Sequence, residues 1–383
     1  MEEKKLLKDI ISKNKDNIAF IIGNGIHRHY KYSAISWEDL LKKLWKQYVN
    51  ESLETFPNQG ISNTEFYDLI ELNYMRSFNT IDYKDKLRTY IQSVDTAKIE
   101  ILKLKCADTT IKDAADKLKN TIDNLRKYTN PEIQDLSYEE FIIGLSYIVS
   151  NESIRRIYMN SIKKQIAKDM AKWKNDDVSI FVQYAKNINA PIMTTNYDKV
   201  LEKSINCKKI IKKEINTSEG MNKRDFSDFY PWNVYYSDKE YSDFGIWHIN
   251  GILDYPRSIK LGLCDYMGCV EKARKMILQG RSVFGIDTFN ENDTNYWPGH
   301  NTWLHYIFNK NLFIFGLGLN EDEVFLRWLL IQRAKFSTTF QRPVKGWYVT
   351  KDINDGKKIF LEALGFEIII IKDFKTLYEE IWK

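Results

Sequence analysis

Short runs of apolar residues recur along the chain between longer segments with helical periodicity. The runs with the length of a strand occupy residues 18–22, 190–195, 244–249, 311–315, 346–350 and 366–371. A strand that is apolar at every position is typical of a parallel sheet, which is buried on both faces. The alternation of strands and helices therefore predicts a doubly wound, Rossmann-like α/β fold with a ligand crevice at the carboxyl ends of its strands.

Helices are expected where apolar residues recur every three or four positions. One such segment opens the chain, with Leu6, Leu7, Ile10 and Ile11 on one side. Ser36 is suited to start a second helix, because an acidic residue follows three positions later, close to a capping box. Further helices are expected at 322–335 and 357–364, each directly before a strand-like run.

The central part of the chain has a different pattern of apolar residues. Residues 62–189 carry apolar residues at helical spacing and lack strong strand signals. We therefore expect a helical insertion at 62–189, within a nucleotide-binding α/β domain formed by residues 1–61 and 190–383. Later in the chain, residues 258–262 are consistent with a strand and 266–279 with a helix over the pocket.

Composition limits the class of protein. The chain has 383 residues, of which 43% are hydrophobic and 28% charged, and this balance excludes a disordered chain. A net charge of +5, from 57 basic and 52 acidic residues, is too even to indicate a nucleic-acid-binding protein. The lysine cluster at 203–213 is interpreted first as a solvated edge and second as an anion-facing patch.

The four cysteines argue against a zinc site or a disulfide framework, because no C-x-x-C pair is present. The lysine-rich N-terminus does not have the pattern of a signal peptide. No run approaches the ~18 apolar residues that a membrane span needs. These features predict a cytoplasmic protein without membrane association and without a bound metal.

Glycines follow two of the predicted strands. Gly23 and Gly25 follow the first, and Gly316 and Gly318 follow a later one. Glycines at strand ends let the backbone approach a phosphate, and a helix N-terminus beyond them supplies N–H donors. For the first pair alone, a tight turn between strand and helix is an equally good interpretation.

Polar residues follow two other strands. Asn196 can orient a water or a ribose hydroxyl, while Asp198 can accept from a hydroxyl or cap its helix. In a strand, His248 and Asn250 point to one face, and a histidine is a natural general base. A histidine of this kind is also often a buried residue with satisfied hydrogen bonds.

These four strand ends, in this order, resemble the sirtuin-like (SIR2-like) NAD-binding family, in particular its bacterial antiphage NAD hydrolases. Gly23-Asn-Gly-Ile26 is similar to the family's phosphate loop, and 195–198 to its threonine–glutamine–asparagine–isoleucine–aspartate signature. The segment 36–41 is similar to a tryptophan-containing segment of prokaryotic members, and 316–318 to a late ribose–adenine loop. The resemblance covers roughly two-thirds of the chain and leaves out the helical insertion.

The sequence departs from the family pattern at two points. The zinc module of protein-deacylating sirtuins is missing, which argues against peptide deacylation. The family's catalytic histidine directly precedes a glycine, whereas Asn250 holds that place here and His248 lies two residues earlier.

The resemblance implies hydrolysis of NAD to nicotinamide and ADP-ribose, which depletes NAD in antiphage defence by abortive infection. It implies a catalytic set of Asn196 for the ribose and water, His248 for proton abstraction and Asp198 for support. NAD is the substrate, and no zinc is expected. The residues implied to bind it are Gly23, Asn24, Gly25, Ile26, His27, Thr195, Asn250, Gly251, Gly316 and Gly318.

The family also implies control by a homo-oligomer or by a defence partner, with a HerA-type ring ATPase as the first candidate. Two alternatives to hydrolysis remain. One is a module that senses NAD or ADP-ribose without turnover. The other is a nuclease subunit that processes nucleic acid within a larger complex, for which the lysine cluster is the only support.

Overall fold

The computed structural model describes residues 2–30, 35–49, 53, 57, 60–77, 162–171, 177–212, 230–239, 243–284 and 299–383. The chain divides into two compact units. The first comprises Met1–Leu40, Pro57–Glu65 and Ala167–Lys383, and the second comprises Leu41–Phe56 and Phe66–Ile166. The sheet and the candidate site both belong to the first unit.

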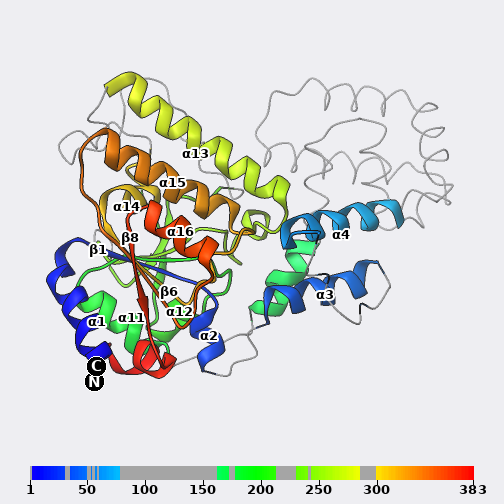
Figure 1. Cartoon of the computed structure of the whole chain (residues 1–383). Coiled ribbons are helices and arrows are strands. Elements are labelled where there is room, and N and C mark those ends of the chain that lie inside the picture. Colours follow the sequence, from blue (N-terminus) through cyan, green and yellow to red (C-terminus); the bar gives the residue numbers. More distant parts are fainter. Residues whose placement is uncertain are drawn as a thin grey trace. The chain divides into compact units, whose positions relative to one another are not determined.

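The first unit is built on one eight-stranded sheet, in the order β3-β4-β5-β2-β1-β6-β7-β8 (Figure 1). The strands from β5 to β8 in this order are parallel, while β3 and β4 form an antiparallel margin. The strands are β1 (Ile18–Ile22), β2 (Ile192–Thr194), β3 (Lys208–Ile211), β4 (Val234–Ser237), β5 (Ile246–His248), β6 (Asn311–Phe315), β7 (Gly346–Thr350) and β8 (Phe366–Ile370). The predicted doubly wound α/β fold is confirmed.

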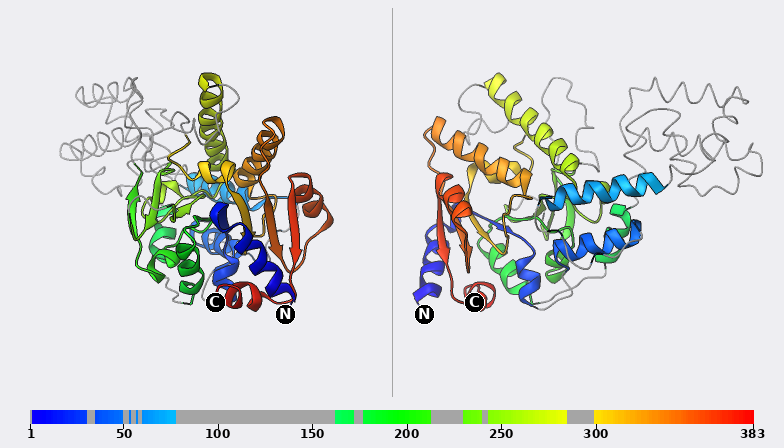
Figure 2. Two further views of the ribbon diagram at one scale, coloured as in Figure 1. Left: turned by 90° about the vertical axis from the view of Figure 1, so that its left-hand side faces the viewer. Right: turned by 45° about the vertical axis from the view of Figure 1, so that its right-hand side comes forward.

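Helices cover both faces of the sheet (Figures 1 and 2). On one face lie α1 (Glu2–Lys13), α11 (Ser179–Asn187), α12 (Val200–Ser204) and the C-terminal helical turn Thr376–Glu380. On the other lie α13 (Leu263–Phe284), α14 (Leu304–Asn309), α15 (Val324–Thr339) and α16 (Asp355–Ala363). Two helices follow β1 along the chain, α2 (Gly25–His29) and α3 (Trp37–Tyr48).

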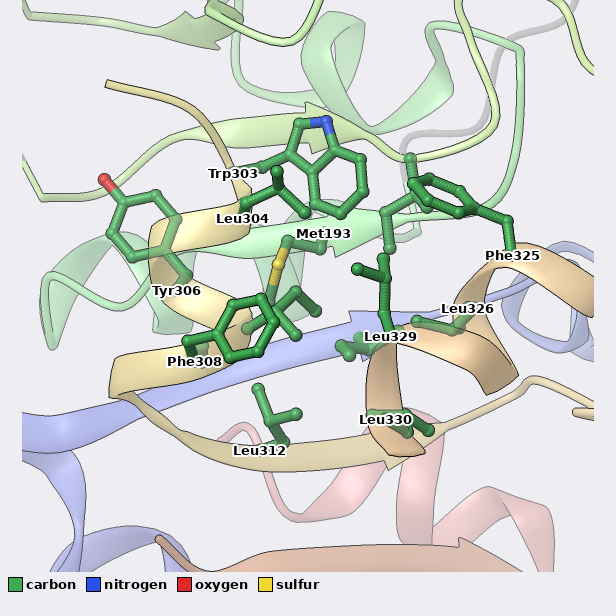
Figure 3. Close-up of a cluster of buried hydrophobic side chains, with 14 of the residues drawn as sticks. Met193, Trp303, Leu304, Tyr306, Phe308, Leu312, Phe325, Leu326, Leu329 and Leu330 are labelled. Atoms are coloured by element: carbon green, nitrogen blue, oxygen red, sulfur yellow. The ribbon is translucent and has the colours of Figure 1, made fainter. Parts of the chain in front are cut away.

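The strands sort their side chains between two cores by alternation. In β1, Phe20 packs with α11, whereas Ala19 and Ile21 pack toward α14 and α15. Every residue of β1 and β6 is buried. Burial of each large apolar side chain stabilises the fold by about 1.5–3 kcal/mol. Figure 3 shows the core on the face covered by α14 and α15, where Met193 of β2 lies among leucines and aromatic rings of these helices.

Local signals set the start of α3 as predicted. The Ser36 hydroxyl accepts a hydrogen bond from the Asp39 backbone N–H at 3.0 Å and donates to the Asp39 carboxylate at 2.6 Å. This reciprocal pair satisfies a backbone donor that the first turn of a helix leaves open.

Three elements differ from the sequence prediction. The strands β3 and β4 were not predicted, because β3 is largely exposed and β4 is only four residues long. The strand expected at 258–262 is wrong: a 3₁₀ turn at Pro256–Ser258 occupies its start. The backbone N–H of Lys260 donates instead to the carbonyl of Asn250, at 2.8 Å.

The segment predicted as a helical insertion, 62–189, contains α4 (Asn63–Ser77), a helical stretch at 162–170 and α11. Helix α11 packs on the sheet as part of the first unit. Residues 78–161 of the segment lie outside the described residues. In the second unit, aromatic pairs at 4.9 Å between ring centroids join Trp45 to Phe66 and Tyr48 to Tyr74. No helix in the described part of the chain combines the length and apolar character of a membrane span.

Candidate functional site

A cleft of about 690 Å³ lies at the carboxyl ends of the parallel strands. Its walls are the loops that follow β1, β2, β5, β6 and β7. The strand order reverses between β1 and β6, because the chain adds β2 on one side of β1 and β6 on the other. Ligands of open α/β sheets bind at such a switch point, and the volume suits a small-molecule site.

The loops after β1 and β6 are joined directly. The backbone N–H of Gly25 donates to the carbonyl of Gly316 at 2.8 Å. Gly316 has φ +64°, a conformation that favours glycine. A Cβ on Gly23 or Gly25 would lie within 2.8 Å of Gly316 atoms. Close packing between these two loops therefore accounts for both of the earlier glycines.

Eight of the predicted site residues line the cleft in the structure, and the other five do not. Those on the wall are Asn24, Gly25, Thr195, Asn196, Asp198, Asn250, Gly316 and Gly318. Those outside the lining are Gly23, Ile26, His27, His248 and Gly251. Ile26 packs in the apolar core, and Gly251 turns the chain with φ +99°. These five residues do not line the cleft, and the role predicted for them stays a prediction.

Two asparagine side chains on the cleft wall carry buried polar atoms without a hydrogen-bond partner. Asn196 is 9% exposed, and its side-chain nitrogen Nδ2 is one of these atoms. Asn250 is 2% exposed, and its oxygen Oδ1 is the other. Leaving such a group unsatisfied costs about 1–3 kcal/mol. Polar atoms of this kind in a native cleft are completed by a water molecule or by a ligand.

The local structure fixes both asparagines. The Asn196 backbone N–H donates to the Thr194 hydroxyl at 3.1 Å, and Thr195 N–H donates to the carbonyl of Ile22 on β1. The Asn250 amide nitrogen donates to the Glu323 carboxylate at 3.3 Å. Because β2 pairs with β5 in parallel, the two side chains follow neighbouring strand ends.

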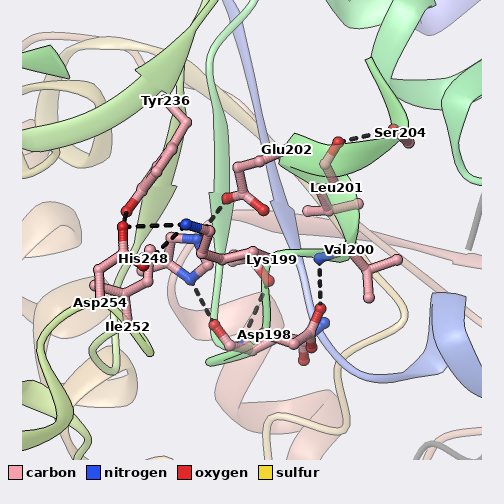
Figure 4. A network of polar contacts seen from close by, with 12 residues as sticks. Asp198, Lys199, Val200, Leu201, Glu202, Ser204, Tyr236, His248, Ile252 and Asp254 are labelled. Atoms are coloured by element: carbon pink, nitrogen blue, oxygen red, sulfur yellow. Dashed lines mark hydrogen bonds and ion pairs between the residues drawn. The ribbon is translucent and has the colours of Figure 1, made fainter. Parts of the chain in front are cut away.

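His248 is not part of the cleft lining, and Figure 4 shows its imidazole beside Glu202. Its Nδ1 lies 2.7 Å from the backbone carbonyl oxygen of Asn196, and its Nε2 lies 2.6 Å from Oε1 of Glu202 on α12. Burial alone lowers the pKa of His248, but the Glu202 carboxylate and the Asn196 carbonyl outweigh it, and the pKa is raised. Both imidazole nitrogens are therefore engaged within the protein, and the role of His248 as general base stays a prediction.

Strand β5 ends at His248, and this explains why the His248 side chain does not point in the predicted direction. The alternation that would have put His248 and Asn250 on one face stops there, and the chain turns at Gly251. The imidazole consequently points to the α12 side, and the amide of Asn250 points toward Glu323.

Asp198 combines two structural contacts with a place on the cleft wall. Its Oδ1 accepts from the backbone N–H of Val200, the first residue of α12, at 2.9 Å. Its Oδ2 pairs with Nε2 of buried His27 at 3.2 Å. Burial raises the pKa of Asp198, but His27 and the Val200 N–H outweigh it, and the pKa is lowered. The carboxylate is thus held ionised beneath the cleft.

His27 completes a second buried acid–base pair. Burial lowers its pKa, but the charges of Asp198 and Glu202 outweigh that effect and raise it. The pairs His27–Asp198 and His248–Glu202 lie close enough for each histidine to be affected by both carboxylates. They form a compact, charged support under the loop that carries Asn196.

Several charged cleft residues were not predicted from the sequence. Asp322 accepts two hydrogen bonds from Asn63, at 2.9 and 2.7 Å, and Glu323 accepts from Asn250. Burial raises the pKa of Glu323 to about 7, Asp322 adds to the rise, and the bond from Asn250 opposes it. The signal was an acidic stretch, Asn320-Glu-Asp-Glu323, directly after the second glycine loop. Glu202 gave no such signal, because its partner lies 46 residues away in sequence.

The wall also carries two cations, Arg28 and Lys357, of which Lys357 bonds to the Asn320 side chain at 2.8 Å. The carboxylates on the wall are Glu38, Asp198, Asp322, Glu323 and Asp352. Within the described ranges, no group of three or more His, Cys, Asp and Glu side chains is arranged to hold a metal ion.

The structure is that of an α/β protein with a polar cleft at the switch point of its sheet, which is a candidate site for a small molecule. No protein-family model matches the chain, and no curated protein matches it either. The function is therefore argued from the site itself.

Proposed function

We propose that the protein hydrolyses NAD, releasing nicotinamide and ADP-ribose. The observation that carries this proposal is the pair of unsatisfied atoms in the cleft, Nδ2 of Asn196 and Oδ1 of Asn250. A hydroxyl group accepts one hydrogen bond and donates another, so it complements an amide N–H and an amide oxygen together. Ribose supplies such hydroxyls beside the bond that is to be broken.

The position of the cleft favours a dinucleotide over a simple sugar. The switch point of a doubly wound sheet is the usual place for a nucleotide. Arg28 and Lys357 provide positive charge suited to a pyrophosphate. Asp322 and Glu323 provide negative charge beside Asn250, suited to the positively charged nicotinamide end of NAD.

The same carboxylates suit the chemistry. Cleavage of a glycosidic bond passes through an oxocarbenium-like state in which positive charge develops on the ribose. Fixed negative groups in a partly buried cleft stabilise such charge more strongly than they would in water. Asn196 and Asn250 would orient the ribose, and Asp198 would hold the loop of Asn196 through its bonds to α12 and His27.

The cellular role in this proposal follows from the sirtuin-like resemblance of the strand-end motifs. Depletion of NAD would stop phage growth by abortive infection. Uncontrolled hydrolysis would harm the host, so assembly into a homo-oligomer or with a HerA-type ATPase would control the activity.

The proposal is tested by incubating the full-length protein with NAD, alone and together with the product of its neighbouring gene. Nicotinamide and ADP-ribose released in equal amounts, measured by chromatography, are the expected result. NAD that remains intact under both conditions contradicts hydrolysis.

A second function, sensing of NAD or ADP-ribose without turnover, is favoured by one observation. Asn250 holds the place of the histidine in the family pattern, and His248 is not part of the cleft lining. Native mass spectrometry separates the two proposals: bound nucleotide that persists for hours without product supports sensing.

A further inference from the structure

Glu323 occupies a distinctive position at the cleft. It ends the loop that follows β6 and immediately precedes α15, whose first residue is Val324. Its carboxylate Oε2 accepts a hydrogen bond from Nδ2 of Asn250, the residue that also presents the unsatisfied Oδ1. A ligand held by Asn250 would therefore lie beside this carboxylate.

The groups around Glu323 have opposing effects on the pKa of its carboxyl group. Asp322 precedes it and raises its pKa, while the Asn250 amide supports the ionised form. The phenols of Tyr197, from the loop after β2, and Tyr266, from α13, are affected by its charge. Burial and these neighbours leave the pKa of Glu323 at about 7, so both protonation states are populated near neutral pH.

Three other acid–base groups near the cleft are engaged within the protein. His248 has both ring nitrogens engaged, and Asp198 is paired with His27 and bonded to α12. Asp322 accepts both the backbone and the side-chain hydrogen bond of Asn63. Glu323 is bonded to a neutral amide at the longer distance of 3.3 Å, which leaves its carboxylate available to a water molecule.

We propose that Glu323 accepts the proton of the attacking water, in the place of the histidine base expected from the sequence. The inference rests on the proposed hydrolysis of NAD and assigns the proton transfer of that reaction to the loop after β6. In this proposal Asn250 has two roles, because its Oδ1 orients the ribose and its Nδ2 orients Glu323.

The step balances without a further reactant. One hydrogen of the water passes to the Glu323 carboxylate as the water oxygen bonds to C1′ of the ribose. The bond between C1′ and the pyridinium nitrogen breaks, and its electron pair stays on that nitrogen, which leaves as neutral nicotinamide. Glu323 then gives its proton to solvent, so NAD⁺ and water yield nicotinamide, ADP-ribose and one proton.

The test compares three full-length variants with the wild type: Glu323→Gln, Glu323→Asp and, as matched control, Glu321→Gln. Glu321 is an exposed acid two residues earlier in the same loop and is not part of the cleft lining. Glutamine keeps an acceptor for Asn250 but takes up no proton. NAD binding is measured by calorimetry, turnover by nicotinamide release between pH 5 and 9, and folding by circular dichroism.

We expect Glu323→Gln to bind NAD within about threefold of the wild type while kcat falls by about 10²–10⁴-fold, the usual contribution of a general base. A base works in its ionised form, so wild-type kcat should rise as pH increases through about 7. That rise should be absent in Glu323→Gln, displaced in Glu323→Asp and unchanged in Glu321→Gln.

Two results overturn the inference and differ from each other. If Glu323→Gln cleaves NAD at the wild-type rate and with the wild-type pH profile, the role of Glu323 is wrong and the proposed hydrolysis stands. If the wild type itself binds NAD but releases no nicotinamide with or without its neighbour, hydrolysis fails and the proton transfer fails with it.

Discussion

Nδ1 of His248 lies 2.7 Å from the backbone carbonyl oxygen of Asn196, so the imidazole holds the loop that presents the Asn196 amide to the cleft. The opposite nitrogen, Nε2, is held by Glu202. His248 thus acts on the site through the backbone of its neighbour. His248 therefore supports the loop, while the Asn196 amide faces the cleft. Variants of the two residues test these roles independently.

Replacing Asn196 by alanine should abolish nicotinamide release and leave the fold intact. The Nδ2 atom makes no hydrogen bond within the protein, so its removal breaks no bond of the fold and should change the free energy of unfolding by less than about 1 kcal/mol. Activity by chromatography and stability by urea denaturation check both parts.

Asn14→Ala is the matched control for that change. Asn14 donates to the Ile10 carbonyl at 2.7 Å and accepts from Asn311, at the amino end of β1. Its loss should cost about 1 kcal/mol of stability and leave turnover unchanged. Equal turnover by Asn196→Ala and the wild type would remove Asn196 from the mechanism.

Removal of one partner from the buried His248–Glu202 pair should be strongly destabilising. His248→Ala leaves the Glu202 carboxylate buried without its cation and should lower the free energy of unfolding by about 3–5 kcal/mol. The double variant His248→Ala/Glu202→Gln should lose less than the sum of the two single variants. Additive losses in a double-mutant cycle would show that the two side chains are not coupled.

The contribution of His248 to stability should depend on pH. Its pKa in the folded protein is raised above the model-compound value of 6.5. The native state therefore binds a proton more tightly than the unfolded chain, and the stabilisation is fully present below pH 6.5. It should be lost as pH rises through the raised pKa.

The measurement is the difference in unfolding free energy between the wild type and His248→Gln at each pH from 5 to 9. Taking the difference cancels His305, whose pKa burial lowers to about 3 and which drives stability in the opposite direction. A difference that stays constant or grows with pH would contradict the buried, protonated pair.

Gly251→Ala should prevent stable folding. Gly251 has φ +99°, and an added Cβ would lie 2.0 Å from the Ser258 carbonyl oxygen. The substitution would cost about 1–3 kcal/mol in backbone strain. It would also displace the turn that carries Asn250. Gly365→Ala is the control, because Gly365 has φ +78° but open space around it. It should cost only about 1–2 kcal/mol. Similar melting temperatures for the two variants would refute the steric argument.

Most of the sheet could be predicted from the sequence because burial on both faces leaves an unbroken apolar run. Strands β1, β6 and β7 have the predicted bounds. The edge strand β3 lacks that signal, since its lysines face solvent. Residues 258–262 carry an apolar pattern, but after the turn at Gly251 a backbone hydrogen bond from Lys260 holds them against Asn250 rather than in the sheet.

The cleft was predicted in outline, and its chemistry only in part. The strand ends locate Asn196, Asn250 and the glycine loops, because the topology brings those ends together. The direction of the His248 side chain depends on where β5 stops and on Glu202, a partner on another element. The protonation of Glu323 depends on burial by residues distant in sequence, which no local pattern records.

The bond from Gly25 to Gly316 joins the loops that follow β1 and β6, so this part of the cleft wall comes from the beginning and the last quarter of the chain. During translation the early wall stays incomplete until β6 and α15 have left the ribosome. A chain that ends before β6 would lack Gly316 and the loop that carries Glu323, and so would lack this part of the cleft.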